Sequence, residues 1–253
     1  MRLDLAAILA AADARPIDAT LARRLVSVID LTTLNGDETE ADIEALCARA
    51  TNHGVAAVCV LPGALPVAAR CLDGSRVRLA TVANFPHGGD DLAGIADEVA
   101  AAVAAGAMEV DIVAPLEATL EGDVGLTGEL ITLCREAAGP TITLKLILET
   151  GRLERPELIT AVARSAVMAG IDFLKTSTGK IPVGATPEAA ALLFAVAQEA
   201  EGKVGVKISG GVRTARDAMR YWQIGETVMG AGWLTAAHFR FGASKLLDEL
   251  VQP

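Results

Sequence analysis

Five ionisable residues stand within short apolar segments of this chain, where a buried strand would otherwise carry aliphatic side chains. They are Asp30, Asp111, Lys145, Lys175 and Lys207. Lysine is rarely buried without a partner, because burial disfavours its charged form. When three lysines lie close together and are removed from water, the pKa of at least one of them should be lowered toward neutrality. A lysine in its neutral form can then attack a carbonyl carbon. The pattern predicts a Schiff-base enzyme, in which the aspartates keep the other lysines charged and move protons.

Three glycine-rich stretches could supply a phosphate site beside these lysines. They offer backbone N–H groups and hydroxyls, and Lys180 adds a positive charge. Each stretch alone is most often a turn, and no Walker A motif is present because Leu174 stands where that motif needs glycine. The last of them is expected to open the final helix. The stretches are Ser177-Thr178-Gly179-Lys180, Ser209-Gly210-Gly211 and Phe241-Gly242-Ala243-Ser244-Lys245.

The elements that must position these residues recur as an amphipathic helix, a glycine and a short apolar strand. The glycines fit the left-handed position that ends a helix, and one of them, Gly225, is expected to end a helix that begins after Thr214. Eight strands are predicted in this way, at 27–31, 55–61, 78–83, 108–113, 142–148, 172–176, 204–208 and 227–229.

Alternating strands and helices indicate a parallel sheet, and eight such units in 253 residues predict a closed (β/α)8 TIM barrel. We expect a single domain over residues 1–253, with a helical extension over residues 1–25. An open doubly wound sheet is the alternative, but no G-x-G-x-x-G motif follows the first strand. In a barrel, the catalytic side chains come from the carboxyl ends of the strands.

Composition limits the partners of the protein. The chain has 32 acidic and 22 basic residues and a net charge of −10, which argues against binding to nucleic acid or to a membrane surface. Glycine and proline interrupt the longest uncharged window, 51–69, and the acidic N-terminal segment does not resemble a signal peptide. We therefore expect a cytoplasmic protein. The three histidines and four cysteines form no metal-binding motif and no C-x-x-C, so neither a metal nor a disulfide is expected.

The chain resembles the deoxyribose-phosphate aldolase family from about residue 25 to about residue 250. The lysine-bearing run K-T-S-T-G-K, together with the later lysine and G-G-V-R-T, is the most specific part of this resemblance. The matching segments are 29–35 (IDLTTLN), 84–88 (NFPHG), 109–111 (EVD), 174–180 (LKTSTGK), 205–207 (GVK), 210–214 (GGVRT) and 241–244 (FGAS).

The resemblance implies a class I aldolase that reversibly cleaves 2-deoxyribose 5-phosphate to acetaldehyde and glyceraldehyde 3-phosphate, without a metal or another cofactor. By the same resemblance, Lys175 forms the Schiff base, Lys207 lowers its pKa and Asp111 transfers protons. Asp30 and Lys145 belong to the polar network that links these residues.

The resemblance also implies a substrate site and its partners. Cys59 lies near the substrate in this family, and the phosphate-binding positions correspond to Gly179, Lys180, Gly210, Gly211 and Ser244. The implied ligands are a sugar phosphate and acetaldehyde. The resemblance is also compatible with a homodimer.

Three residues depart from the pattern of the family. Ile208-Ser209 replaces the usual Pro-Ala, and Lys245 stands where a second serine is common. One residue further along a helix is rotated by about 100°, so we expect Lys245 to point away from a ligand that Ser244 faces. Another Schiff-base barrel, such as a larger-sugar aldolase or a transaldolase, remains an alternative. A sugar-phosphate sensor without activity is a second alternative, since a fold alone does not prove catalysis.

Overall fold

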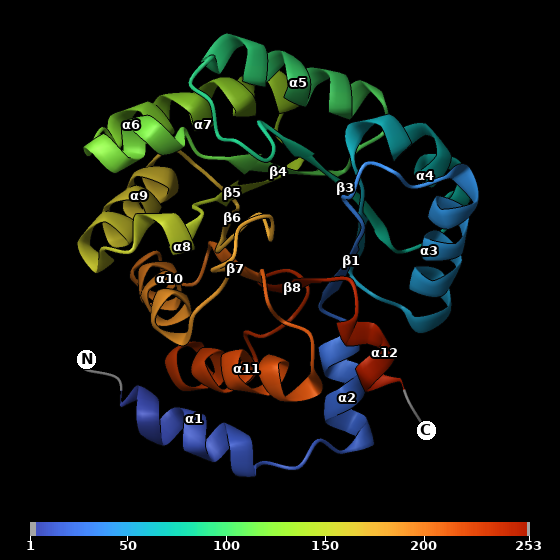
Figure 1. Ribbon diagram of the computed structural model, residues 1–253, viewed down its shortest axis with the longest axis vertical. Coiled ribbons are helices and arrows are strands. Elements are labelled where there is room, and N and C mark those ends of the chain that lie inside the picture. The colour runs from blue at the N-terminus through green and yellow to red at the C-terminus, as the bar shows by residue number, and fades with distance from the viewer. Residues whose placement is uncertain (1–3, 252–253) are drawn as a thin grey trace.

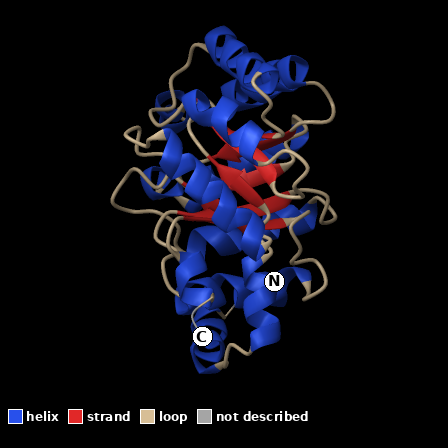
Figure 2. Cartoon of the chain, turned by 90° about the vertical axis from the view of Figure 1, so that its right-hand side faces the viewer, coloured by secondary structure: helices blue, strands red, loops and turns tan. Residues whose placement is uncertain are grey.

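Eight parallel strands close into a barrel at the centre of the molecule, with helices around it (Figure 1). The computed structural model describes residues 4–251. Each strand pairs with the next one and β8 pairs with β1, which confirms the predicted (β/α)8 TIM barrel. In the view turned by 90°, the strands occupy the middle of the molecule and helices cover them (Figure 2). The strands are β1 (Ile29–Thr32), β2 (Ala57–Cys59), β3 (Arg78–Ala83), β4 (Glu109–Val113), β5 (Thr143–Ile147), β6 (Phe173–Lys175), β7 (Gly205–Ser209) and β8 (Phe239–Ala243).

The helices begin and end at residues that satisfy their free backbone groups. Thr39 and Thr214 each form a capping box with the third residue of the helix that follows, and Gly54 ends its helix in the left-handed conformation. The helices are α1 (Leu5–Ala14), α2 (Ala19–Val26), α3 (Glu40–His53), η1 (Pro62–Ala64), α4 (Leu65–Cys71), α5 (Leu92–Ala104), α6 (Leu116–Glu121), α7 (Gly125–Ala138), α8 (Thr150–Leu153), α9 (Pro156–Met168), α10 (Pro187–Glu199), α11 (Ala215–Met229) and α12 (Leu246–Leu250).

Two helices precede β1, where the sequence suggested one extra helix. Helix α1 lies along α11 on the outside of the barrel (Figure 1). Asp13 anchors α1 by accepting hydrogen bonds from the Arg220 guanidinium at 2.8 and 2.9 Å, and Arg15 pairs with Glu226. Within residues 4–251, every helix is too short or too polar to span a bilayer.

The prediction of an eighth strand at 227–229 is wrong. Residues 227–229 form the last turn of α11, which continues past Gly225 and ends at Gly230, whose φ is 85°. Gly225 is a packing residue: a Cβ there would lie 2.9 Å from the Phe194 ring of α10. Residues 241–243 of the stretch expected to open the final helix instead belong to β8, and α12 starts only at Leu246.

Candidate active site

The register of the barrel strands brings the five marked residues together inside the barrel. Asp111 of β4 is paired with Lys145 of β5, and Lys175 of β6 is paired with Lys207 of β7. Asp30 of β1 lies near Lys207 because the barrel closes between β8 and β1. All five side chains are buried, and Lys175 is the only one of them that lines a cavity in the described part of the chain.

Asp111 is the acid that contacts all three lysines. Its Oδ2 accepts from Lys175 Nζ at 2.8 Å and from Lys207 Nζ at 2.7 Å, and its Oδ1 accepts from Lys145 Nζ at 2.7 Å. Burial would raise the pKa of the Asp111 carboxyl, but the three ammonium groups outweigh that effect and hold the pKa well below its ordinary value. Asp111 is therefore an ionised carboxylate that connects the lysines.

The lysines differ in the direction of their pKa shifts. Burial lowers the pKa of Lys175, the positive charge of Lys207 lowers it further, and contact with Asp111 only partly compensates. Burial acts on Lys207 in the same way, but Asp111 and Asp30 outweigh it and raise the pKa of Lys207. The pKa of Lys145 is likewise raised by its carboxylate partners against the effect of burial. Lys175 is thus the lysine that most readily becomes a neutral nucleophile.

Two buried charged residues that the sequence analysis did not mark complete the network. Glu109, two residues before Asp111 on the same face of β4, contacts Lys145 at 2.6 Å. Arg240 of β8 contacts Glu109 at 3.0 Å and Asp30 at 2.6 Å. The alternation of side chains along β4 could have marked Glu109. Arg240 was missed because the eighth strand was predicted at 227–229 instead of at Phe239–Ala243.

A cavity of about 240 Å³ opens above Lys175, between the loops that follow β1, β6, β7 and β8. All five predicted phosphate positions line it, and residues missed in the sequence analysis line it too. The predicted positions are Gly179, Lys180, Gly210, Gly211 and Ser244, to which Thr178 and Ser209 of the same glycine-rich stretches are added, and the missed residues include Thr32, Asn35 and Arg213.

Glycine backbone forms much of the rim of this cavity. Gly179, Gly210 and Gly211 have φ values of 78°, 85° and 95°, a region that L-residues with side chains rarely adopt. Lys180 and Arg213 are exposed cations at the rim. Backbone N–H groups and two cations suit an anionic end of a ligand. Lys245 is exposed and is not among the residues that line the cavity.

Cys59 does not reach the cavity. Its side chain is fully buried on β2, next to the lysines, and it is not among the residues that line the cavity. Burial raises the pKa of the Cys59 thiol, so the sulfur is held in its protonated and less reactive form.

Glu149 is a further buried acid that the sequence analysis did not mark. It follows β5, and its carboxylate accepts hydrogen bonds from the backbone N–H and the hydroxyl of Thr178. The Thr178 hydroxyl in turn accepts from the Lys180 N–H at 3.1 Å. Glu149 therefore fixes the loop that carries the cavity residues Thr178, Gly179 and Lys180.

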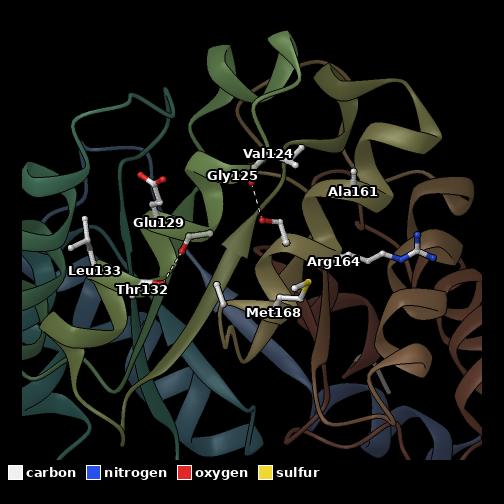
Figure 3. Close-up of a pocket in the computed structure, with 11 residues that line it drawn as sticks. Val124, Gly125, Glu129, Thr132, Leu133, Ala161, Arg164 and Met168 are labelled. Carbon is white, nitrogen blue, oxygen red and sulfur yellow. Dashed lines mark hydrogen bonds between the residues drawn. The ribbon is translucent and has the colours of Figure 1, made fainter.

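A larger hollow, of about 790 Å³, lies on the outer surface between α7 and α9. Figure 3 shows Glu129 and Arg164 on opposite sides of it, with Met168 between them. Arg164 is already paired with Glu199 at 2.7 Å, and no lysine lines the hollow. The larger hollow therefore lacks a candidate lysine nucleophile, and the smaller cavity beside the buried lysines is the candidate active site.

The charged cluster is not arranged as a metal site in the part of the chain that the structure describes. Its three carboxylates, Asp30, Glu109 and Asp111, are each occupied by lysine or arginine.

Comparison with known proteins gives the same fold and a consistent family. The family model described as DeoC/LacD family aldolase matches residues 24–247. A protein from Coccidioides immitis, provisionally named deoxyribose-phosphate aldolase, is 30% identical over 97% of this chain and 96% of that chain, with a TM-score of 0.82. The deoxyribose phosphate aldolase of Aeropyrum pernix, described as a tetramer, is 27% identical over 96% of this chain and 95% of its own, with a TM-score of 0.76.

Proposed function

The chain belongs to the DeoC/LacD family of aldolases, and from that premise we propose that it cleaves 2-deoxy-D-ribose 5-phosphate to acetaldehyde and D-glyceraldehyde 3-phosphate. The observation that carries the proposal is Lys175, a buried lysine with a lowered pKa at the floor of a cavity whose rim suits an anion. The deoxyribose phosphate aldolase of Aeropyrum pernix and the Coccidioides immitis protein provisionally given the same name are among its structural relatives, which supports this choice of substrate.

The reaction begins when neutral Lys175 attacks the C1 aldehyde of the open-chain sugar. The carbinolamine takes up a proton, supplied through Lys207 and Asp111, and loses water to give a positively charged iminium between the lysine nitrogen and C1. A base removes the proton of the C3 hydroxyl, the C2–C3 bond breaks, and its electron pair moves into the iminium to form an enamine. Glyceraldehyde 3-phosphate leaves, C2 of the enamine takes up a proton, and water hydrolyses the new iminium to acetaldehyde and free lysine.

The residues around Lys175 have distinct parts in this proposal. Asp111 contacts both Lys175 and Lys207 through one oxygen, so it can pass protons between them. Lys207, held protonated by two carboxylates, donates protons and opposes protonation of Lys175. Asp30 and Lys145 fix the positions of Lys207 and Asp111. The rim residues Gly179, Lys180, Gly210, Gly211 and Ser244 bind the phosphate, and Cys59 supports the site from behind the lysines.

A turnover assay tests this function. The protein should release acetaldehyde from 2-deoxyribose 5-phosphate in the presence of EDTA, because the iminium itself accepts the electron pair and no metal is called for in the mechanism. Lys175→Leu should abolish turnover, while Lys203→Leu, an exposed lysine paired with Glu201, should leave it unchanged. No turnover on this substrate, combined with turnover on a larger sugar phosphate, would favour another Schiff-base aldolase. Absence of any turnover would favour a sugar-phosphate sensor.

A further inference from the structure

Every strand of the barrel contributes at least one ionisable side chain to its interior or its rim. These groups are Asp30 from β1, Cys59 from β2, Arg78 from β3, Glu109 and Asp111 from β4, Lys145 from β5, Lys175 from β6, Lys207 from β7 and Arg240 from β8, with Glu149 just after β5.

Six of these groups form a closed ring of alternating charges, which we call the charge ring. Each of its acids contacts two of its cations at 3.0 Å or less, and each cation contacts two acids in the same way, while a longer contact of 3.9 Å joins Lys145 to Asp30 across the ring. Around the ring, the contacts are Asp30–Lys207 at 2.5 Å, Lys207–Asp111 at 2.7 Å, Asp111–Lys145 at 2.7 Å, Lys145–Glu109 at 2.6 Å, Glu109–Arg240 at 3.0 Å and Arg240–Asp30 at 2.6 Å.

The charge ring is neutral as a whole, and Lys175 stands outside it. Three carboxylates balance three cations, and all six side chains are at most 4% exposed. Among the carboxylates of residues 4–251, Lys175 contacts Asp111 alone, at 2.8 Å. A protonated Lys175 would add an uncompensated charge to a buried cluster, which is strongly unfavourable.

We propose that Glu109 and Arg240 are positioning residues of the aldolase: they close the charge ring and make it neutral, and so leave Lys175 as the one amine without a proton. The proposal rests on the proposed function, because it explains how the nucleophile of that reaction is prepared. Neither side chain lines the cavity, so both act through other residues.

The other ionisable groups near Lys175 have smaller effects on this balance. The Cys59 thiol is neutral because burial raises its pKa. Burial also raises the pKa of the Glu149 carboxyl, although the hydrogen bonds from Thr178 and the charge of Lys175 act in the opposite direction, and Glu149 forms no ion pair within the described chain. Arg78 contacts Glu109 at 2.5 Å, but its side chain is 38% exposed, so solvent screens its charge. Lys180 is exposed at the rim of the cavity.

The test measures how Lys175 modification depends on pH. Wild type and variants are mixed with acetaldehyde at a series of pH values and reduced with borohydride, and the fraction of Lys175 that carries an ethyl group is read by mass spectrometry. Arg240→Gln leaves the ring with an excess negative charge, which favours protonation of Lys175, so the midpoint should move up by about one pH unit. Glu109→Gln leaves an excess positive charge, so the midpoint should move down.

The charge-balanced variant separates this effect from general damage. The double variant Glu109→Gln/Arg240→Gln removes one charge of each sign and should return the midpoint close to that of wild type, and Arg240→Lys should also restore it. If Arg240→Gln does not fold, Arg78→Gln serves in its place: it weakens the positive charge beside Glu109 at a half-exposed position and should give a smaller upward shift. The matched controls are Arg164→Gln and Glu199→Gln, which break an exposed pair and should give no shift.

The outcomes distinguish failure of the charge-ring proposal from failure of the proposed aldolase function. Opposite shifts in the single variants, cancelled in the double variant, support the charge ring. An adduct on Lys175 with one shared midpoint for wild type and all variants, or shifts of the same sign in both single variants, overturns it. If wild type forms no adduct on Lys175 at any pH, the proposed function itself fails.

Discussion

Lys175 and Lys207 share one oxygen of Asp111, yet their surroundings have opposite effects on them. Lys207 also contacts Asp30, and two carboxylates outweigh the cost of burying its charge. Lys175 has no second carboxylate, so burial and the neighbouring ammonium lower its pKa. A group with a lowered pKa is neutral over a wider range of pH. The neutral, nucleophilic form of Lys175 therefore predominates above its pKa. As the pH falls below that pKa, the amine is protonated and its reactivity is lost.

Replacing Lys207 tests this difference. Lys207→Leu removes a like charge next to Lys175 and frees the carboxylate of Asp111, and both changes raise the pKa of Lys175. The pH at which the acetaldehyde adduct forms should rise, and turnover should fall by at least roughly a hundredfold. The measurement is a pH–rate profile beside that of Lys203→Leu, an exposed control. An unchanged profile would show that Lys207 does not tune the nucleophile.

The sequence marked the residues nearest to the chemistry but not those that support them. A charged side chain between aliphatic neighbours was enough to mark Asp111 and the three lysines. Glu109 also stands between apolar neighbours, Met108 and Val110, two residues before Asp111, so the alternation along the strand could have marked it. Its contact with Lys145 depends on the strand register, which no local pattern contains.

The loops after β6 and β7 interlock through glycine. A Cβ on Gly184 would lie 2.3 Å from the carbonyl oxygen of Gly210, and one on Gly210 would lie 2.9 Å from Gly184 Cα. The backbones of the two loops can pack this closely only without side chains. Ala185 strengthens the contact by donating its N–H to the Gly210 carbonyl at 2.9 Å. The positions of the rim residues Gly210 and Gly211 therefore depend on a residue that does not line the cavity.

Gly184→Ala tests this packing. The added methyl group forces the two loops apart, so the Michaelis constant for 2-deoxyribose 5-phosphate should rise by roughly tenfold, equivalent to about 1.4 kcal/mol of binding free energy. Activity toward unphosphorylated deoxyribose should change less. Gly63→Ala is the matched control, since a Cβ there meets nothing within 4 Å. Equal effects of Gly184→Ala on both substrates would argue against a role in holding the phosphate.

The two lysines close to the glycine-rich stretches should differ in their effect on phosphate binding. Lys180 lines the cavity, whereas Lys245 is exposed outside it. Lys180→Ala should raise the Michaelis constant for the phosphorylated substrate by about tenfold, because a charge-assisted contact is lost. Lys245→Ser should leave it nearly unchanged. A tenfold rise from Lys245→Ser, with unphosphorylated deoxyribose unaffected, would place Lys245 at the phosphate.

Seven of the strands follow from local sequence, and the eighth shows where such inference fails. Residues 227–229 follow a glycine and have a composition typical of a strand. That glycine, Gly225, lies within α11 and packs against Phe194 of α10. This contact joins residues that are distant in sequence, so the pattern alone could not separate a helix stop from a packing glycine. The true strand contains Gly242, which local strand propensity disfavours, and its Arg240 has a role only through contacts with residues distant in sequence.

Closure of the barrel creates the site. Asp30 and Arg240 stand near opposite ends of the chain, and they meet because β1 and β8 are neighbours in the closed sheet. Gly242 has a related role: a Cβ there would lie 3.0 Å from Lys207 Cε, so its absence leaves room for the lysine to reach the two acids. The sequence predicted that the marked aspartates and lysines lie together, but only the closed barrel shows that Glu109 and Arg240 join them in one ring.

The central claim is that Lys175 is the residue that bonds to the substrate, and one measurement tests it most directly. The protein is treated with acetaldehyde and borohydride, and the modified lysines are located by peptide mass spectrometry. The structure predicts an ethyl group on Lys175, at the cavity floor, while Lys145 and Lys207 remain unmodified as protonated members of the charge ring. An adduct on Lys145 or Lys207, with Lys175 unmodified, would contradict the account.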